Sequence, residues 1–422
     1  MKAARLLFLV LGLALIVAAI LKLPVIEPGL HMIFGLVFLS VGIRIHPFLK
    51  GFTYTVLILA AVAMALYYPQ YFLQVGSFEL KGLIIPLLQI IMFGMGSQMS
   101  LKDFKGVIMS PRAVLIGVIC QFTIMPFIAW MLISFFRFPA EIAAGIILVG
   151  ASPSGLASNV MAFLAKANVA LSVTLTAVAT LLAPVLTPLI MQTLAGELIP
   201  VDFWNMMLGI MNMVIIPIVA GLIFNLFAFS EISRRGRVIQ ILGFSMIILL
   251  KHAIALGSGL SAPDALWLTL SFDLMGFVLL PIVAGMVFFK VFGRNRALME
   301  KILSLVSMLA IGIIITVITA AGRDNLLEIG LLLIVACLLH NLLGYGLGYW
   351  TCRLLGVDRA SCRTIAFEVG MQNSGMASGV ALQMGKIATV GLAPSVFGPL
   401  MNVTGSSLAT WWRGKAVEVG EV

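Results

Sequence analysis

The amino-acid sequence predicts an all-α polytopic membrane protein with about 14 transmembrane helices in two inverted repeats. The composition excludes a soluble globular protein, because 62% of the 422 residues are hydrophobic and 10% are charged, against roughly 45–50% and about 25% in an ordinary soluble domain. The apolar segments are continuous runs of helical length, not the alternating ten-residue segments of a β-barrel. Two polar motifs, at residues 150–159 and 368–375, interrupt these runs.

The individual helices follow from the apolar runs, since about 20 apolar residues cross the roughly 30 Å of hydrocarbon in a bilayer. The first run is longer than the 7–15 apolar residues of a signal peptide and lacks a small-residue cleavage site, so we expect an uncleaved first helix. The predicted spans are residues 6–24, 28–45, 51–70, 82–100, 113–135, 140–165, 168–195, 203–228, 238–258, 266–289, 302–321, 326–351, 364–385 and 388–411.

The distribution of basic residues orients these spans. Of the 26 Lys and Arg residues, 20 fall in loops and tails on the side of the N-terminus, five on the opposite side, and Lys251 within a span. Cytoplasmic loops carry the excess of Lys and Arg in membrane proteins, so we expect both termini to be cytoplasmic in a multi-pass protein of the inner (plasma) membrane. The net charge of +10 is explained in the same way, and we expect no nucleic-acid partner.

Internal repeats predict the domain organisation. The pentapeptide Pro-Ile-Val-Ala-Gly occurs at residues 217–221 and again 64 residues later at 281–285, which predicts a duplicated helical hairpin. A weaker similarity relates residues 47–51 to residues 103–106. Two halves of seven spans would enter the membrane in opposite directions, as in many transporters. The predicted parts are an extra N-terminal hairpin (1–50), a first repeat (51–200, core helices about 113–195) and a second repeat with the inserted hairpin (201–422, core helices about 326–411).

Apart from Glu141 and Glu328, which lie within the first three residues of their spans, the acidic residues within the predicted spans are Asp273 and Glu368. An ionisable group inside a span needs a partner or a function. Lys251 and Asp273 each lie 11 residues from Ala262. In an antiparallel hairpin that turns at Ala262 they would lie at equal depth, which favours a structural ion pair over a role in transport.

Glu368 opens the second polar motif, Glu-Val-Gly-Met-Gln-Asn-Ser-Gly, whose two glycines weaken the helix and free backbone carbonyls. The first motif contains Pro153, which removes a backbone donor. The motifs lie in the sixth span of each half, and paired discontinuous helices at corresponding positions indicate a binding site at the midplane. Carboxylate, amide and hydroxyl oxygens suit a hard cation such as Na⁺, whereas the N-termini of half-helices favour an anion.

These motifs resemble the bile acid:sodium symporter family. The resemblance rests on residues 91–96, 150–159, 167–176, 368–375 and 402–410 within a match from about 51 to 413. It implies a core domain and a panel domain, and two Na⁺ sites that share Glu368. The first would use Ser158, Asn159, Ser172, Thr176 and Glu368; the second would use Gln121, Glu368, Gln372 and the carbonyls of Val369 and Met371.

The resemblance also implies that Asn373 and Asn402 face the substrate. This sequence departs from the family's usual pattern at two places. Ser154-Gly155-Leu156 stands where the family usually has Gly-Gly-Thr, so Ser154 and Leu156 are further candidate substrate residues. Met401 replaces a histidine. Both changes make the expected cavity more apolar.

The predicted function is therefore Na⁺-coupled symport of an organic anion, bile-acid-like or a small carboxylate, by alternating access. Two alternatives stay open: a proton-coupled or Na⁺/H⁺-exchanging transporter that uses Glu368, and a non-transporting ligand sensor. An enzyme is not expected, because the sequence has no Walker, nucleophile-elbow or zinc-protease motif. The four cysteines lack C-x-x-C spacing and are expected to be buried thiols. The sequence leaves the oligomeric state open.

Overall fold

The computed structural model describes residues 2–22, 27–46, 49–104, 107 and 109–415. Regular structure in these ranges is helical apart from one small hairpin of β1 (Gln74–Val75) and β2 (Phe78–Glu79). Nine helices in the described ranges are long and apolar enough to cross a membrane. The chain is an all-α polytopic membrane protein, as its composition predicts.

Each predicted span overlaps one helix or two consecutive helices. The unbroken helices are α1 (Lys2–Ile20), α2 (Pro28–Gly42), α3 (Thr53–Tyr67), α5 (Ile84–Gln98), α7 (Pro111–Phe136), α10 (Val169–Ala195), α13 (Arg234–Gly257), α16 (Arg296–Ala321), α17 (Arg323–Leu354) and α20 (Leu392–Arg413). The interrupted ones are α8 (Ala140–Ala151) with α9 (Leu156–Leu164), and α18 (Arg359–Gly370) with α19 (Ser374–Gln383). The number of crossings and the inverted relation of the two halves stay predictions.

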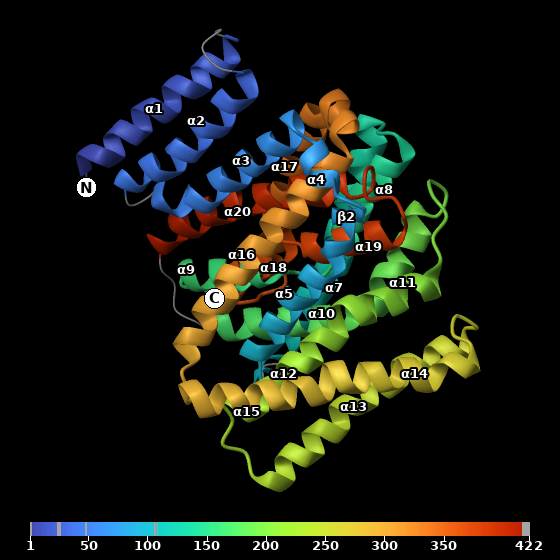
Figure 1. The fold of residues 1–422 in the computed structure, drawn as a ribbon. Helices are drawn as coiled ribbons and strands as arrows, with labels where there is room; N and C mark the ends of the chain where they lie inside the picture. Colours follow the sequence, from blue (N-terminus) through green and yellow to red (C-terminus); the bar gives the residue numbers. More distant parts are fainter. Residues whose placement is uncertain (1, 23–26, 47–48, 105–106, 108, 416–422) are drawn as a thin grey trace.

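The two interrupted helices lie inside a bundle that we call the crossing bundle, formed by α7–α10 and α17–α20 (Figure 1). Its helices pack closely because their facing residues are small or apolar. Every residue of α18 from Ala360 to Gly370 is buried, and so is every residue of α8 from Ile142 to Ala151. The polar motifs are therefore enclosed by protein and do not face lipid.

A second group, which we call the flanking layer, consists of α3, α5, α16 and the continuous segment α11 (Phe203–Ile210), η5 (Met211–Ile215) and α12 (Ile216–Ala228). Helix α5 packs against both α12 and α16, and α16 also packs against α3. The layer contacts the crossing bundle mainly through α19, α20 and α10. Residues of both groups therefore face each other across one interface.

The two copies of the 64-residue sequence repeat have the same local structure. The second copy consists of η6 (Met275–Leu279) and α15 (Leu280–Phe292), and in both copies a five-residue π-helical segment precedes a 13-residue α-helix. Gly221 approaches the backbone of α5, and a Cβ at Gly285 would lie 2.8 Å from the carbonyl oxygen of Phe224 in α12. Each copy thus uses its glycine to pack against the next helix inward.

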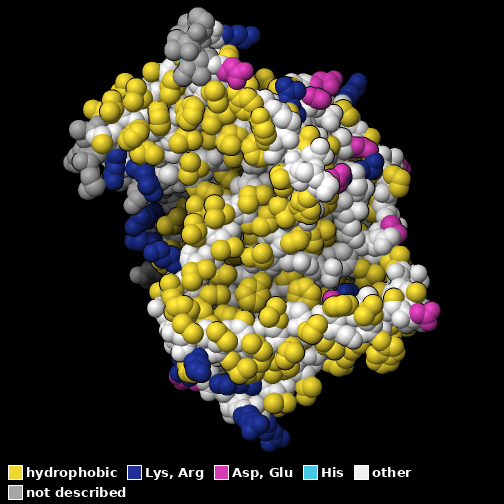
Figure 2. Space-filling view, in the orientation of Figure 1, with side chains coloured by type: hydrophobic (Ala, Val, Ile, Leu, Met, Phe, Trp, Pro, Cys, Tyr) yellow, Lys and Arg dark blue, Asp and Glu magenta, His cyan; other side chains and the backbone are white. Residues whose placement is uncertain are grey.

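Two hairpins lie at the periphery. Helices α1 and α2 pack on each other and then on α3, and α15 packs on α12 with α13 and α14 (Pro263–Leu274) beside it (Figure 1). The weaker repeat at residues 47–51 and 103–106 falls partly outside the described residues, at 47–48 and 105–106. Figure 2 shows Lys and Arg side chains gathered at the lower end, where α13 begins and α15 ends.

Candidate functional site

The two breaks meet at the centre of the crossing bundle. The backbone N–H of Asn373 donates to the carbonyl of Pro153 at 2.7 Å, and the N–H of Gly155 donates to the carbonyl of Met371 at 3.3 Å. The unwound segments therefore run antiparallel as a short bridge. This pairing satisfies backbone groups that the broken helices leave free, which is a requirement at membrane depth.

Side chains of neighbouring helices satisfy the carbonyls at the ends of the first half-helices. Thr187 of α10 donates to the carbonyl of Ala151 at 2.7 Å, and Asn341 of α17 donates to the carbonyl of Gly370 at 2.7 Å. Thr404 of α20 donates to the amide oxygen of Asn341 at 2.5 Å. The sequence analysis missed these three residues; their only signal is a polar side chain within an apolar run.

The carboxylate of Glu368 lies in α18, within one turn of the break, and its residue is 2% exposed. The break itself begins only at Met371, because the helix continues through Gly370. Oε2 of Glu368 accepts hydrogen bonds from Ser154 at 2.5 Å and Thr176 at 2.8 Å, and Oε1 accepts one from Ser172 at 2.5 Å. No ion pair among the described residues includes this carboxylate.

The residues predicted for the first Na⁺ site lie together around this carboxylate. Oγ of Ser172 also lies 2.8 Å from Oδ1 of Asn159, Oγ1 of Thr176 lies 3.2 Å from the same oxygen, and the hydroxyl oxygens of Ser158 and Thr176 are 3.5 Å apart. Each hydroxyl has one proton to donate, so neither Ser172 nor Thr176 can donate to Glu368 and Asn159 at the same time. The cluster gathers carboxylate, amide and hydroxyl oxygens within hydrogen-bond distance of one another, a set of atoms that suits a hard cation.

The glutamines predicted for the second Na⁺ site also contact each other. Nε2 of Gln121 donates to Oε1 of Gln372 at 2.8 Å and to the carbonyl of Ser152 at 2.9 Å, and Nε2 of Gln372 donates to the carbonyl of Val369 at 2.6 Å. Oε1 of Gln121 is buried without a hydrogen-bond partner among the described residues. A buried oxygen without a donor is costly, and a cation would satisfy it.

The hydrogen bonds of Glu368 connect it to the first set. They go to Ser154, Ser172 and Thr176, and no hydrogen bond from Gln121 or Gln372 reaches it within the described part of the chain. The carbonyl of Met371, predicted for the second set, accepts the N–H of Gly155. That Glu368 is shared by two ion sites stays a prediction.

A pocket of about 220 Å³ lies beside the crossing, between the crossing bundle and the flanking layer. The predicted substrate residues Leu156, Asn373 and Asn402 line it, as does Met401. Ser154, the fourth predicted substrate residue, is 1% exposed and instead donates to Glu368. None of the described lining residues is Lys, Arg, Asp or Glu.

Both second half-helices begin at this pocket. Helix α9 starts at Leu156 without a side-chain cap, whereas α19 is capped by Asn373, whose Oδ1 accepts the N–H of Met376 at 3.0 Å. Because helix N-termini carry partial positive charge, they give the pocket a positive potential without a basic side chain. The sequence analysis missed the opposite wall, where Thr55 and Ser307 supply hydroxyl groups from α3 and α16.

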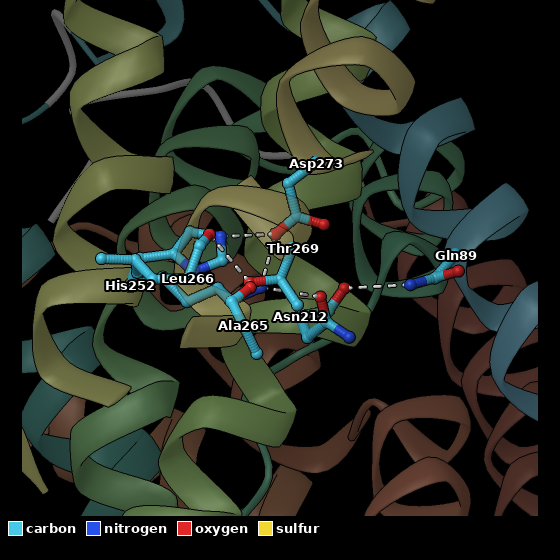
Figure 3. Close-up of polar contacts among 8 residues, drawn as sticks. Gln89, Asn212, His252, Ala265, Leu266, Thr269 and Asp273 are labelled. Atoms are coloured by element: carbon cyan, nitrogen blue, oxygen red, sulfur yellow. Dashed lines mark hydrogen bonds and ion pairs between the residues drawn. The ribbon is translucent and has the colours of Figure 1, made fainter. Parts of the chain in front are cut away.

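The predicted ion pair between Lys251 and Asp273 is confirmed, with Nζ 2.5 Å from Oδ2 (Figure 3). His252, which the sequence analysis did not connect to it, lies 3.1 Å from the same oxygen, and Lys251 also reaches the side chain of Asn212 at 3.5 Å. Asn212 is linked in turn to Gln89 of α5, which donates to its backbone carbonyl. This network joins the inserted hairpin to the flanking layer, away from the crossing.

The four cysteines are free and buried, as predicted. His340 is also buried, and its Nε2 lies 3.0 Å from the carbonyl of Met125. No group of three His, Cys, Asp or Glu residues in the described ranges has the geometry of a metal site. The buried polar chemistry of the crossing is therefore built from one carboxylate, amides and hydroxyls.

Comparison with known proteins gives relatives over most of the chain. A model of the "Sodium Bile acid symporter family" matches residues 85–262. The "Uncharacterized sodium-dependent transporter YocS" of Bacillus subtilis is 35% identical over 366 residues, which are 86% of this chain and 92% of that protein. The "Probable sodium/metabolite cotransporter BASS1, chloroplastic" of Arabidopsis thaliana is 30% identical over 329 residues, which are 78% of this chain and 66% of that protein. The chain belongs to the sodium bile acid symporter family.

Proposed function

We propose that this protein is a Na⁺-coupled symporter that brings an organic anion into the cell by alternating access. The observation that carries the proposal is the buried carboxylate of Glu368, which has hydroxyl partners and no cationic one within the described chain. A buried, unpaired negative charge is costly. A Na⁺ ion among the oxygens of Ser158, Asn159, Ser172 and Thr176 would neutralise it.

The neighbouring pocket supports an anionic co-substrate with an apolar body. The N-termini of α9 and α19 would attract its charge, whereas Leu156 and Met401 would contact its apolar surface. A pocket of about 220 Å³ is smaller than the roughly 300–1,000 Å³ of sites that enclose drug-sized ligands. The geometry thus favours a small carboxylate over a bile-acid-sized anion in this conformation.

Na⁺ binding and substrate binding would be coupled, because the same unwound segments border both the ion cluster and the pocket. We propose two Na⁺ ions per transport cycle, with Gln121 and Gln372 in the second site. Two Na⁺ ions and a monovalent anion carry one net positive charge inward. Each such charge gains about 2.3 kcal/mol per 100 mV of membrane potential, so uptake would be driven by both the Na⁺ gradient and the voltage.

The direct test is Glu368→Gln, which keeps the shape of the side chain and removes its charge. We expect Na⁺-stimulated uptake and Na⁺-dependent thermal stabilisation of the purified protein to be lost, with K⁺ as the ionic control. Glu300→Gln, which changes an exposed carboxylate on α16, should leave both unchanged. A Glu368→Gln protein with unaltered Na⁺ dependence would refute the proposal. Uptake by the unaltered protein that needs a pH gradient and no Na⁺ would favour the proton-coupled alternative.

A further inference from the structure

A separate groove lies between the crossing bundle and the flanking layer, on the side of α10. Its inner part is a cavity of about 260 Å³ lined by residues of α5, α10, α12 and α13. Thr180 is the only polar residue among the described residues of this lining, and its hydroxyl donates to the carbonyl of Thr176 at 2.7 Å. Because the hydroxyl proton of Thr180 is already used in this hydrogen bond, the described lining of the inner part has no free side-chain donor for a water molecule. An apolar cavity of roughly 150 Å³ already stays dry and binds apolar ligands.

The outer part is a cavity of about 630 Å³ that adjoins the inner part. The two share four apolar lining residues, Met99, Leu101, Leu222 and Phe244. The outer part also has polar walls, with Gln240 of α13 and Arg296 of α16 among them. The groove as a whole is therefore amphipathic, apolar within and polar at its mouth.

The mouth carries a positive charge, that of Arg296, which is not paired with any carboxylate of the described residues. The guanidinium of Arg296 lies over the ring of Phe229, 5.2 Å from its centroid, and it forms no ion pair with the described residues. Glu231, the carboxylate among the described lining residues, pairs instead with Arg294. Two further basic side chains contact lining residues of the mouth, since Arg294 pairs with Glu231 and Arg237 donates to the carbonyl of Ser230 at 3.2 Å.

We propose that this groove binds an anionic phospholipid of the cytoplasmic leaflet, with an acyl chain in the inner part and its headgroup beside Arg296. The basic end of the molecule is the predicted cytoplasmic end, where anionic lipids attract basic residues. Helix α13, which belongs to the inserted hairpin, contributes Gln240 to the outer part, Ile247 to the inner part and Phe244 to both. The inserted hairpin therefore completes a groove whose other walls include α5, α10 and α12.

The position of the groove gives the lipid a consequence for transport, and this consequence rests on the proposed function. The acyl chain would fill the gap between α10 of the crossing bundle and α12 of the flanking layer. Relative movement of these two groups would require the chain to leave or shift. Bound lipid would therefore slow the change between inward and outward states.

Lipid binding can be tested on the full-length, delipidated protein by native mass spectrometry. The probes are dioleoyl-phosphatidylglycerol, dioleoyl-phosphatidylcholine and glycerol phosphate, which has the charge without the chains. Ile247→Trp fills the inner part from α13, and Leu181→Trp fills it from α10. Leu242→Trp is the matched control, because Leu242 lies on α13 and is 62% exposed. Arg296→Gln removes the charge at the mouth, with Arg235→Gln as its exposed control on α13.

We expect phosphatidylglycerol to bind more tightly than phosphatidylcholine and glycerol phosphate not to bind. Ile247→Trp or Leu181→Trp should weaken both lipids at least ten-fold, and Arg296→Gln should weaken phosphatidylglycerol about five-fold, the effect of one basic residue near an anionic surface. The controls should bind as the unaltered protein does. Equal binding of the two lipids, or binding that both tryptophan variants leave unchanged, would overturn the proposal. Either result would leave the Na⁺ dependence tested by Glu368→Gln unaffected, so the two failures can be told apart.

Discussion

One carboxylate and its hydroxyl partners determine the chemistry of the crossing. Three hydroxyls converge on Glu368 from α10 and from the break after α8. Ser154 contributes one of them, although it stands where the family usually has glycine. The hydroxyl of Ser154 donates a hydrogen bond to Oε2 of Glu368, an oxygen that would otherwise be available to a cation. The substitution therefore changes the surroundings of the ion cluster more than the lining of the pocket.

Gln121 offers a test of the second proposed Na⁺ site. Its Oε1 is buried without a partner among the described residues, so we expect Gln121→Leu to lower the apparent Na⁺ affinity of uptake several-fold and to reduce the Hill coefficient for Na⁺ towards one. Gln192→Leu, at an exposed position of α10, should change neither. An unchanged Na⁺ dependence in Gln121→Leu would rule out a cation at this oxygen.

The interrupted helices show how an element of secondary structure can create a site. Pro153 and the glycine-containing motif at 368–375 predict two breaks. The backbone hydrogen bonds from Asn373 to Pro153 and from Gly155 to Met371 explain why the breaks coincide. The same bonds would transmit movement of one half-helix to the other. The long helices α10 and α17 provide Thr187 and Asn341, which hold the carbonyl ends of the breaks in place.

The inserted hairpin depends on its intramembrane ion pair. Lys251 and Asp273 have side chains that are 15% and 16% exposed, and removing one partner of such a pair costs about 3–5 kcal/mol. We expect Lys251→Met to lower the thermal midpoint of unfolding by several degrees. Lys251→Met combined with Asp273→Leu should recover most of the loss, because no unpaired charge is left. Lys301→Met, at an exposed position of α16, is the control.

Failure of the double variant to recover stability would show that the pair is not the source of the loss. His252 makes the experiment more informative, since it contacts the same carboxylate oxygen as Lys251. Any part of the stability that the double variant does not recover includes the contacts of His252 with Asp273 and of Lys251 with Asn212. The two long helices of the hairpin are among the least buried candidate spans of the described chain, so we expect this pair to be a large share of what holds the hairpin in place.

For the molecule as a whole, the proposed transport by alternating access would require the crossing bundle to move against the flanking layer. Leu156 and Ile311 line the pocket from the two groups, whereas Thr55 and Ser307 line it from within the flanking layer. We expect a cleavable bifunctional thiol reagent to stop uptake in the Leu156→Cys/Ile311→Cys variant and cleavage of the spacer to restore it. The Thr55→Cys/Ser307→Cys variant is the control for blockage of the pocket.

Equal inhibition of the two double-cysteine variants would indicate that the reagent only obstructs the pocket. Full uptake by cross-linked Leu156→Cys/Ile311→Cys protein would exclude relative movement of the crossing bundle and the flanking layer. The four native cysteines are buried, which limits their reaction with the reagent. Parallel measurements with and without phosphatidylglycerol would connect this movement to the lipid groove.

The sequence alone determined the class of protein, the position of the helices and the two breaks, because these depend on composition and on neighbours along the chain. It also predicted the Lys251–Asp273 pair, since a hairpin brings equally distant residues to one depth. Only the tertiary structure revealed that Ser154 faces Glu368, that Thr187 and Asn341 complete the breaks, and that α13 forms a groove with α10. These contacts join residues far apart in the sequence, and side-chain packing between helices, which no local pattern encodes, decides them.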